Sequence, residues 1–286
     1  MNRVRHRLAA PGLPAPREIG QAATLALYDE LSLAPKPGLV SFVDTGSHAD
    51  MDADTFMRSL FALRHYFVQI AELGAAGEPF PALEACGRAA EARMLAATGG
   101  VNTHRGAIFT LGLLCAAAGA AWRDGTDSRA DVVRQALSWH WGAALAARCD
   151  RPSALPGGIA ARRHGLRSAS QEAAAGFPVL FETALPALTA ALSAGLSPAA
   201  ARVQTLFAVM AVLDDSNLAH RGGLEGLRHA RASASAFLRR GGMAHPGGLE
   251  AARAIHLDFV ARRLSPGGSA DMLGAACWLH RLGVTA

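Results

Sequence analysis

Five short polar segments combine glycine or proline with side chains that could bind or transform an anionic substrate. Each contains a carboxylate, an amide, a hydroxyl or a base. Oxygen ligands of this kind suit Mg²⁺, whose coordination shell is often completed by substrate phosphates. Arginine, lysine and the N-termini of helices suit the phosphates themselves. The sequence therefore predicts that phosphate and Mg²⁺ are bound by five segments, residues 35–38, 46–50, 101–105, 214–221 and 265–271.

The third of these segments precedes the most apolar stretch of the chain. Residues 106–121 are apolar on every side, which is typical of a buried helix. The stretch is too short and too rich in glycine and alanine for a membrane span. The turn Asn102–Arg105 would lie at the N-terminus of this helix, where backbone N–H groups attract anions. An ordinary helix cap by Asn102 or Thr103 explains the turn equally well.

Two adjacent acids, Asp214 and Asp215, end another apolar stretch. Acids at a helix C-terminus oppose the helix dipole, so we expect them to hold a ligand rather than to support the fold. Lys36 is the only lysine among 28 basic residues, which suggests a site that needs a compact ammonium group. No histidine-based metal motif, Walker A loop, dinucleotide-binding fingerprint or Gly-x-Ser-x-Gly elbow is present.

The apolar periodicity predicts an all-α fold that positions these segments at helix ends. Alanine and leucine dominate and no segment shows sustained strand alternation. We expect a flexible tail over residues 1–16 and a single helical catalytic domain over residues 17–286, with the buried helix at its centre. Residues 149–168, rich in glycine, proline and arginine, are expected to form a long loop. The roughly ten expected helices include 17–33, 55–74, 81–97, 106–121, 128–148, 224–240 and 248–264.

Composition narrows the class of partner. The net charge of +5 over 286 residues is mild, and the basic residues are scattered without interleaved aromatics. This favours small anionic molecules over nucleic acid, and no membrane partner is expected. The N-terminus lacks the apolar core of a signal peptide, and the four widely spaced cysteines suit a reducing cytoplasm. The sequence leaves the oligomeric state open, a homodimer included.

Taken together, the polar segments resemble one enzyme family, the triphosphoribosyl-dephospho-CoA synthases. The resemblance covers about residues 18–282 and rests on several motifs in order. It implies transfer of the triphosphoribosyl group of ATP to the ribose 2′-hydroxyl of 3′-dephospho-CoA, with release of adenine. The motifs are Glu30 with 35–40, then 46–51, Glu91 with 100–106, 176–178, 215–217 with 221–223, and 265–271.

We assign roles to the motif residues that go beyond what the resemblance implies. Cleavage at an anomeric carbon needs phosphate clamps, an anion near the developing cation and a base for the attacking hydroxyl. The expected Mg²⁺ ligands are Asp214, Asp215 and Asp271. The expected base or cation-stabilising residues are Asp50, Glu91 and His48. The residues expected to bind or orient phosphate and ribose are Lys36, Ser47, Asn102, Thr103, His104, Arg105, Asn217, Arg221 and Ser269.

The chain departs from the family pattern at a few positions. Arg105 stands where relatives often have lysine, and Ser170 where an arginine is common. Ser41 replaces a frequent aspartate. Residues 41–44, with the absence of a fused transferase domain, favour the malonate decarboxylase branch over the citrate lyase branch.

Two other functions are compatible with the same segments. One is a Mg²⁺-dependent N-glycosyl hydrolase acting on an ADP-ribose-like ligand, in which water replaces the hydroxyl acceptor. The other is a nucleotide-binding module without catalysis. Adenine release that is independent of an acceptor would indicate the first, and nucleotide binding without adenine release the second.

Overall fold

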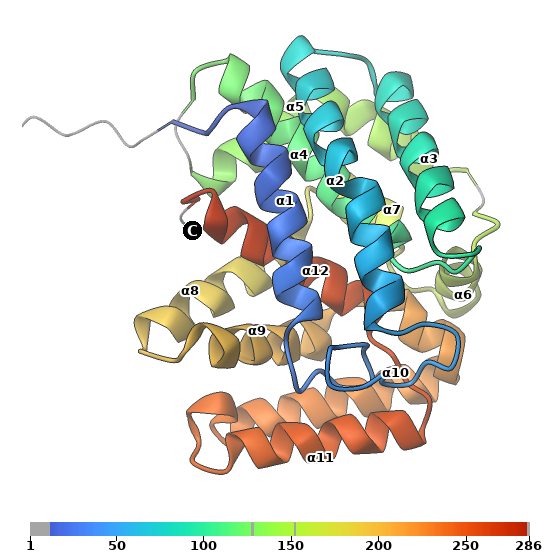
Figure 1. Ribbon diagram of the computed structural model, residues 1–286, viewed down its shortest axis with the longest axis vertical. Coiled ribbons are helices and arrows are strands. Elements are labelled where there is room, and N and C mark those ends of the chain that lie inside the picture. The colour runs from blue at the N-terminus through green and yellow to red at the C-terminus, as the bar shows by residue number, and fades with distance from the viewer. Residues whose placement is uncertain (1–11, 127–128, 152, 285–286) are drawn as a thin grey trace, which may run out of the picture.

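The computed structural model describes residues 12–126, 129–151 and 153–284, and this part of the chain is all-α, as predicted. It contains a π-helical turn, Leu180–Ala184, a 3₁₀ turn, Gly242–Ala244, and twelve α-helices (Figure 1). The helices are α1 (Pro16–Leu31), α2 (Ala53–Ala76), α3 (Phe80–Ala97), α4 (Arg105–Arg123), α5 (Ala130–Cys149), α6 (Pro156–His164), α7 (Ala169–Ala174), α8 (Leu185–Ser193), α9 (Pro198–Val212), α10 (Ser216–Arg239), α11 (Gly248–Ala261) and α12 (Gly267–Arg281).

Helix α4 is the predicted central helix. It packs against α1, α2, α3, α5 and α12, and all but its two ends lie within the core. Its small residues allow this close packing: a side chain at Gly119 would overlap the carbonyl oxygen of Ala71 on α2. Helix α4 is long and apolar enough to span a membrane, but 78% of that apolar window is buried inside the fold. We therefore interpret it as a core helix.

The ends of several helices follow the expected capping rules. Asp52 caps α2 by accepting the N–H of Thr55 at 2.8 Å, and α2 ends at Gly77 in the left-handed conformation. Ser197 caps α9, and Pro198 occupies its first position. These local signals are readable in the sequence, and α2 lies close to its predicted range.

Two boundaries differ from the sequence-based expectations. The expected loop 149–168 contains α6, which begins at a proline and ends at Gly165 in the left-handed conformation. The helix expected over 224–240 is the part of α10 that follows a non-helical kink at Gly223, and helical residues 216–222, which were not expected as a helix, precede the kink. The predicted tail lies mostly outside the described residues. In the described part, Leu13 is already buried and helix α1 begins at Pro16. The flexibility of the preceding residues stays a prediction.

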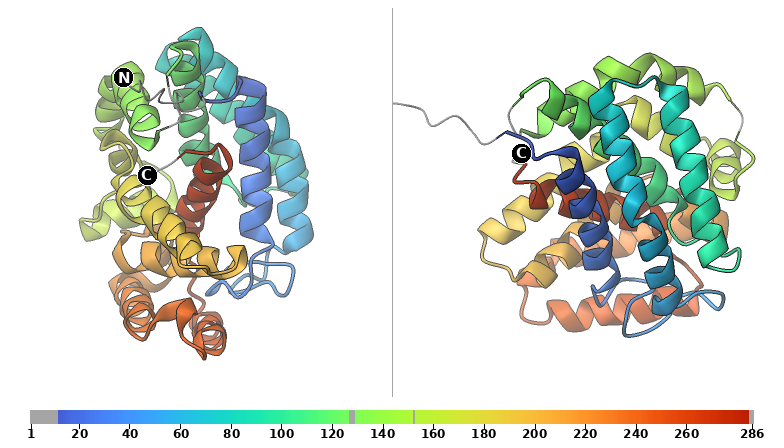
Figure 2. Two further views of the ribbon diagram at one scale, coloured as in Figure 1. Left: turned by 90° about the vertical axis from the view of Figure 1, so that its left-hand side faces the viewer. Right: turned by 45° about the horizontal axis from the view of Figure 1, so that its top comes forward.

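The connection between α1 and α2 crosses one end of the molecule. In Figure 1 it lies beside α11, and the turned views of Figure 2 show the same neighbourhood. His256 on α11 holds it in place: its Nδ1 lies 2.8 Å from the carbonyl oxygen of Lys36, and its Nε2 lies 3.3 Å from the Asp44 carboxylate. This contact places two of the predicted polar segments close to the later helices.

Candidate active site

The N-terminal ends of four helices, α4, α6, α10 and α12, meet in one place. Glycines make the approach possible. A side chain at Gly106 on α4 would clash with the Asp271 carboxyl group on α12, and one at Gly157 on α6 would come within 2.8 Å of the Ser216 hydroxyl. Gly267 on α12 lies similarly close to Asn217 on α10. We call this region the helix-end site. Four positive helix ends facing one another suit an anionic ligand.

Asp215 joins two of these helices. One carboxylate oxygen accepts the N–H groups of Asn217 and Leu218, and the other accepts the N–H of Ser269 at 2.8 Å and its hydroxyl at 2.9 Å. Burial raises the pKa of Asp215, and the hydrogen bonds from Ser269 partly oppose that shift. Asp215 is thus the N-cap of α10, so the premise that this pair of acids ends a helix is wrong for Asp215. At an N-terminus an acid is favourable.

Asp214 is engaged differently from its neighbour. One carboxylate oxygen pairs with the Arg231 guanidinium at 2.6 Å, and the other accepts the N–H of Arg167 at 2.9 Å. Both oxygens therefore already have protein partners that link the start of α7 to α10.

Asp271 is the carboxyl group of the helix-end site that has no hydrogen-bond partner in the described residues. Burial raises its pKa well above the ordinary value, and the negative charges of Asp215 and Glu30 add to the shift. The side chain is nevertheless not fully closed off from solvent. It is therefore the acid in this region that is available to a ligand.

The only lysine forms a buried ion pair. The Nζ atom of Lys36 lies 2.5 Å from Glu30 Oε1, and the two side chains are 1% and 7% exposed. Burial lowers the pKa of Lys36, whereas the charge of Glu30 opposes that shift. Glu30 also acts electrostatically on Asp271, so this pair borders the acids of the helix-end site. The prediction that Lys36 contacts phosphate remains untested.

At the start of α4, Arg105 and Asn102 both have protein partners. The Nε atom of Arg105 donates to Glu91 at 2.6 Å, and Asn102 accepts the backbone N–H of Arg105 at 3.1 Å. Asn102 thus accepts the first N–H group of α4, although the N-cap position itself is His104, whose side chain makes no cap bond. The N–H groups of Gly106 and Ala107 have no acceptor in the described part of the chain, so the helix end can still bind an anion.

His104 and Thr103 complete this turn. The Nδ1 atom of His104 lies 2.6 Å from the Ser59 hydroxyl on α2, and the edge of its ring meets Phe56. Its Nε2 atom and the Thr103 hydroxyl are buried without a partner among the described residues. Burial, with a smaller effect from the Lys36 charge, lowers the pKa of His104 to about 3. The imidazole is therefore neutral at ordinary pH.

A second polar cluster lies on the connection between α1 and α2. His48 Nε2 is 2.9 Å from the Ser265 hydroxyl, and its Nδ1 is 3.6 Å from the exposed Asp50 carboxylate. Burial lowers the pKa of His48, and the charge of Arg221 adds to this effect. Arg221 donates to the carbonyl oxygens of Ser47 and Arg263 at 2.6 and 2.8 Å. This cluster therefore brings four of the predicted residues together next to the start of α12: Ser47, His48, Asp50 and Arg221. The Arg105–Glu91 pair is not part of it.

The predicted Mg²⁺ ligands do not fit a metal site held by the protein alone. No group of three or more histidine, cysteine or acidic residues is placed to hold a metal within the described ranges. The oxygens of Asp214 and Asp215 are taken by protein donors, which leaves Asp271. A single carboxylate is compatible only with an ion whose other ligands come from substrate and water.

Sequence reasoning missed Ser59 and gave no role to Glu30. Ser59 belongs to the amphipathic stripe of α2, where one serine carries no chemical signal. Glu30 precedes the only lysine by six residues, and the unique charge type of Lys36 could have prompted a search for a buried partner. The ion pair needs a chain reversal between α1 and Lys36, which residue spacing alone does not show.

Comparisons with known proteins identify the family of the chain. Residues 16–286 match the family described as ATP:dephospho-CoA triphosphoribosyl transferase. A relative from Vibrio cholerae serotype O1 is 39% identical over 92% of this chain and 87% of its own length. One from Stutzerimonas stutzeri is 39% identical over 94% and 92%, and one from Acinetobacter calcoaceticus is 36% identical over 91% and 89%. All three are named as probable 2-(5''-triphosphoribosyl)-3'-dephosphocoenzyme-A synthases. No solved structure matches the chain.

An all-α fold whose helix N-termini converge beside unpartnered hydrogen-bond donors suits the binding of a small anionic molecule. The chain belongs to the ATP:dephospho-CoA triphosphoribosyl transferase family and is a transferase enzyme.

Proposed function

We propose that the protein transfers the triphosphoribosyl group of ATP to the ribose 2′-hydroxyl of 3′-dephospho-CoA and releases adenine. The observation that carries the proposal is the helix-end site, where four helix N-termini meet and Asp271 is a partly accessible acid. The named activity of the relatives supports the same substrates.

The phosphate-binding part of this site is the start of α4. The unpaired N–H groups of Gly106 and Ala107, the Thr103 hydroxyl and the remaining guanidinium N–H groups of Arg105 are all hydrogen-bond donors. A set of donors without acceptors matches the oxygens of a triphosphate.

The reaction would take place beside the acids. The bond between the anomeric carbon and adenine breaks with its electron pair moving to adenine, and positive charge develops on the ribose. The charges of Asp215 and Glu30 act on Asp271, so this region has a negative potential that would stabilise the developing cation. The acceptor hydroxyl forms the new bond to the anomeric carbon and loses its proton, and adenine gains a proton.

The predicted base stays open between Asp50, Glu91 and His48. Glu91 is neutralised by Arg105, and Asp50 is exposed next to His48. Measuring turnover of Asp50→Asn and Glu91→Gln tests the assignment. Near-wild-type rates in both variants would remove these two residues from the role of base.

Incubation with ATP, with and without 3′-dephospho-CoA, tests the proposed function. We expect adenine to appear only with the acceptor and in equal amount to a product that carries the triphosphoribosyl group. Acceptor-independent adenine release would indicate the hydrolase alternative, and binding without release the non-catalytic one.

Three finer points belong to the proposal. Mg²⁺ enters with ATP, as part of the substrate complex, because Asp271 is the one predicted ligand whose carboxyl group has no protein partner among the described residues. The product serves malonate decarboxylase, as residues 41–44 suggest. The test is whether the product is attached to the acyl carrier protein of malonate decarboxylase rather than to that of citrate lyase. The protein acts in the cytoplasm, in keeping with its free cysteines.

A further inference from the structure

The turn before α4 contains His104, and the residues around it determine the protonation state and tautomer of its ring. His104 is 4% exposed and neutral, and Ser59 on α2 is 0% exposed. The other groups against the ring are Phe56 on α2 and Met94 on α3, whose sulfur accepts the backbone N–H of His104. Lys36 is the charged group that acts on the imidazole. None of these neighbours binds Nε2.

The Ser59 contact determines which ring nitrogen carries the proton. The Ser59 hydroxyl has no acceptor other than His104 Nδ1 in the described residues. With the proton on Nδ1, the hydroxyl proton of Ser59 and the lone pair of Nε2 would both be buried without a partner, whereas with the proton on Nε2 only the Nε2–H group lacks one. Ser59 therefore donates to Nδ1, and the proton of the neutral ring lies on Nε2.

The Nε2–H group is then a buried donor without an acceptor among the described residues. A donor in this state costs free energy, and the cost disappears when an acceptor arrives. The adjacent free groups, the Thr103 hydroxyl and the N–H groups of Gly106 and Ala107, also lack acceptors. A phosphate group is the ligand that supplies several acceptor oxygens at one helix end.

We propose that His104 donates Nε2–H to a phosphate oxygen of the bound nucleotide, and that Ser59 is the positioning residue that keeps the proton on that nitrogen. The proposal rests on the proposed function and assigns the phosphate subsite to this pair. Access requires a small shift of the turn, because Nε2 is enclosed. Gly99 and Gly100, which precede the turn, have positive φ, and a Cβ added at either would meet no atom within 4 Å.

Nuclear magnetic resonance of protein with ¹⁵N-labelled histidine tests the tautomer and the contact directly. We expect His104 in the free enzyme to carry its proton on Nε2, and the Nε2 signal to shift when ATP is added without acceptor. A proton on Nδ1, or a His104 signal that ATP leaves unchanged, would overturn the proposal.

Two substitutions at His104 separate the roles of its nitrogens. A glutamine amide nitrogen can reach the position of Nε2, whereas an asparagine amide reaches that of Nδ1. We expect His104→Asn to raise the Kd for ATP by about 10- to 100-fold, and His104→Gln by much less. Ser59→Ala should raise it by a few-fold and give a mixture of tautomers. Equal affinity in the Gln and Asn variants would contradict the assignment.

The matched controls are His140→Gln and His140→Asn. His140 lies on α5, beside the C-terminal end of α4, and both variants should bind ATP like the wild type. Thermal unfolding of every variant separates loss of binding from loss of fold. Wild-type transfer with an unchanged His104 signal would overturn this inference alone. A signal that responds to ATP in a protein that transfers nothing would overturn the proposed function alone.

Discussion

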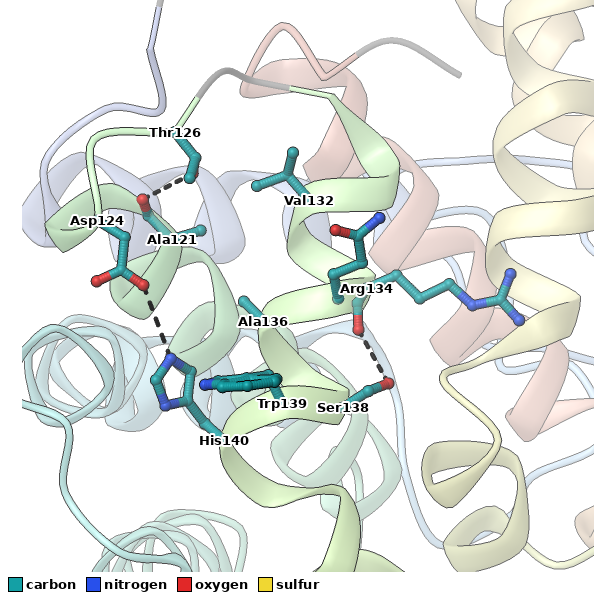
Figure 3. Close-up of a pocket in the computed structure, with 10 residues that line it drawn as sticks. Ala121, Asp124, Thr126, Val132, Arg134, Ala136, Ser138, Trp139 and His140 are labelled. Carbon is teal, nitrogen blue, oxygen red and sulfur yellow. Dashed lines mark hydrogen bonds and ion pairs between the residues drawn. The ribbon is translucent and has the colours of Figure 1, made fainter.

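The two ends of α4 differ in a way that shows how this fold makes a site. At its C-terminal end, about 28 Å from the other by helix geometry, α4 and α5 line a surface pocket of about 640 Å³. Figure 3 shows its side chains, with His140 facing Asp124 and Trp139 beside it. Trp139 is 86% exposed and Asp124 is paired with Arg123. At the N-terminal end, buried donors and an acid lack partners. The C-terminal end of α4 is thus distinguished by a large pocket, and the N-terminal end by polar groups that lack hydrogen-bond partners.

The ion pairs at the two ends should differ most in their effect on stability. Lys36→Met leaves Glu30 as an unpaired buried charge and should lower the free energy of unfolding by about 3–5 kcal/mol. Adding Glu30→Gln to that variant should recover much of the loss. Arg123→Met, at the exposed pair, should cost less than about 1 kcal/mol. Chemical denaturation measures all three, and a small Lys36→Met effect would erase this contrast.

The acids at the two ends should differ most in turnover. Asp271→Asn removes the titratable carboxyl group beside the developing cation and should lower kcat by about 100- to 1,000-fold, while the helical content and Tm stay near those of the wild type. Asp124→Asn is the control and should retain full kcat. Rapid turnover by the Asp271→Asn variant would show that the ribosyl cation forms elsewhere.

The buried histidine should make the protein sensitive to acid. Its pKa is about 3 in the folded state and about 6.5 when unfolded, so below pH 6.5 only the unfolded state takes up this proton. Stability due to His104 is therefore complete above pH 6.5 and declines by roughly 1.4 kcal/mol per pH unit toward pH 3. His104→Gln should remove about 2 kcal/mol of the loss between pH 6.5 and pH 5. Parallel pH profiles of wild type and His104→Gln would be inconsistent with a buried neutral ring, and His140→Gln is the control.

The exposed tryptophan should matter least. Trp139→Ala removes a side chain that is mostly in solvent, so we expect a change in stability within about 0.5 kcal/mol and unchanged kinetics for both substrates. A marked rise in KM for either substrate would make the pocket at the C-terminal end of α4 part of the substrate site.

Local signals predicted much of the fold. The all-α class, the buried central helix and the caps at Asp52 and Ser197 follow from composition, periodicity and capping chemistry. Helix α6 was missed because proline and glycine were interpreted as loop residues, although they stand at its start and just past its end, where both are favourable.

Of the candidate site, residue types could be predicted but their partners could not. The sequence placed acids and arginines at helix ends, yet whether Asp214 meets a metal or Arg231 depends on packing between distant helices. Asp215 was assigned to the end of the preceding helix, because nothing local shows that the next helix begins one residue later. The role of Ser59 becomes visible only through its contact with His104, 45 residues away in the chain.

Photoaffinity labelling with 8-azido-ATP, followed by peptide mapping, tests most directly which end of α4 binds the nucleotide. The account predicts adducts in peptides from residues 98–107, 156–167, 214–223 or 265–271, with loss of labelling when unmodified ATP is in excess. ATP-protected adducts confined to residues 121–140 would contradict it.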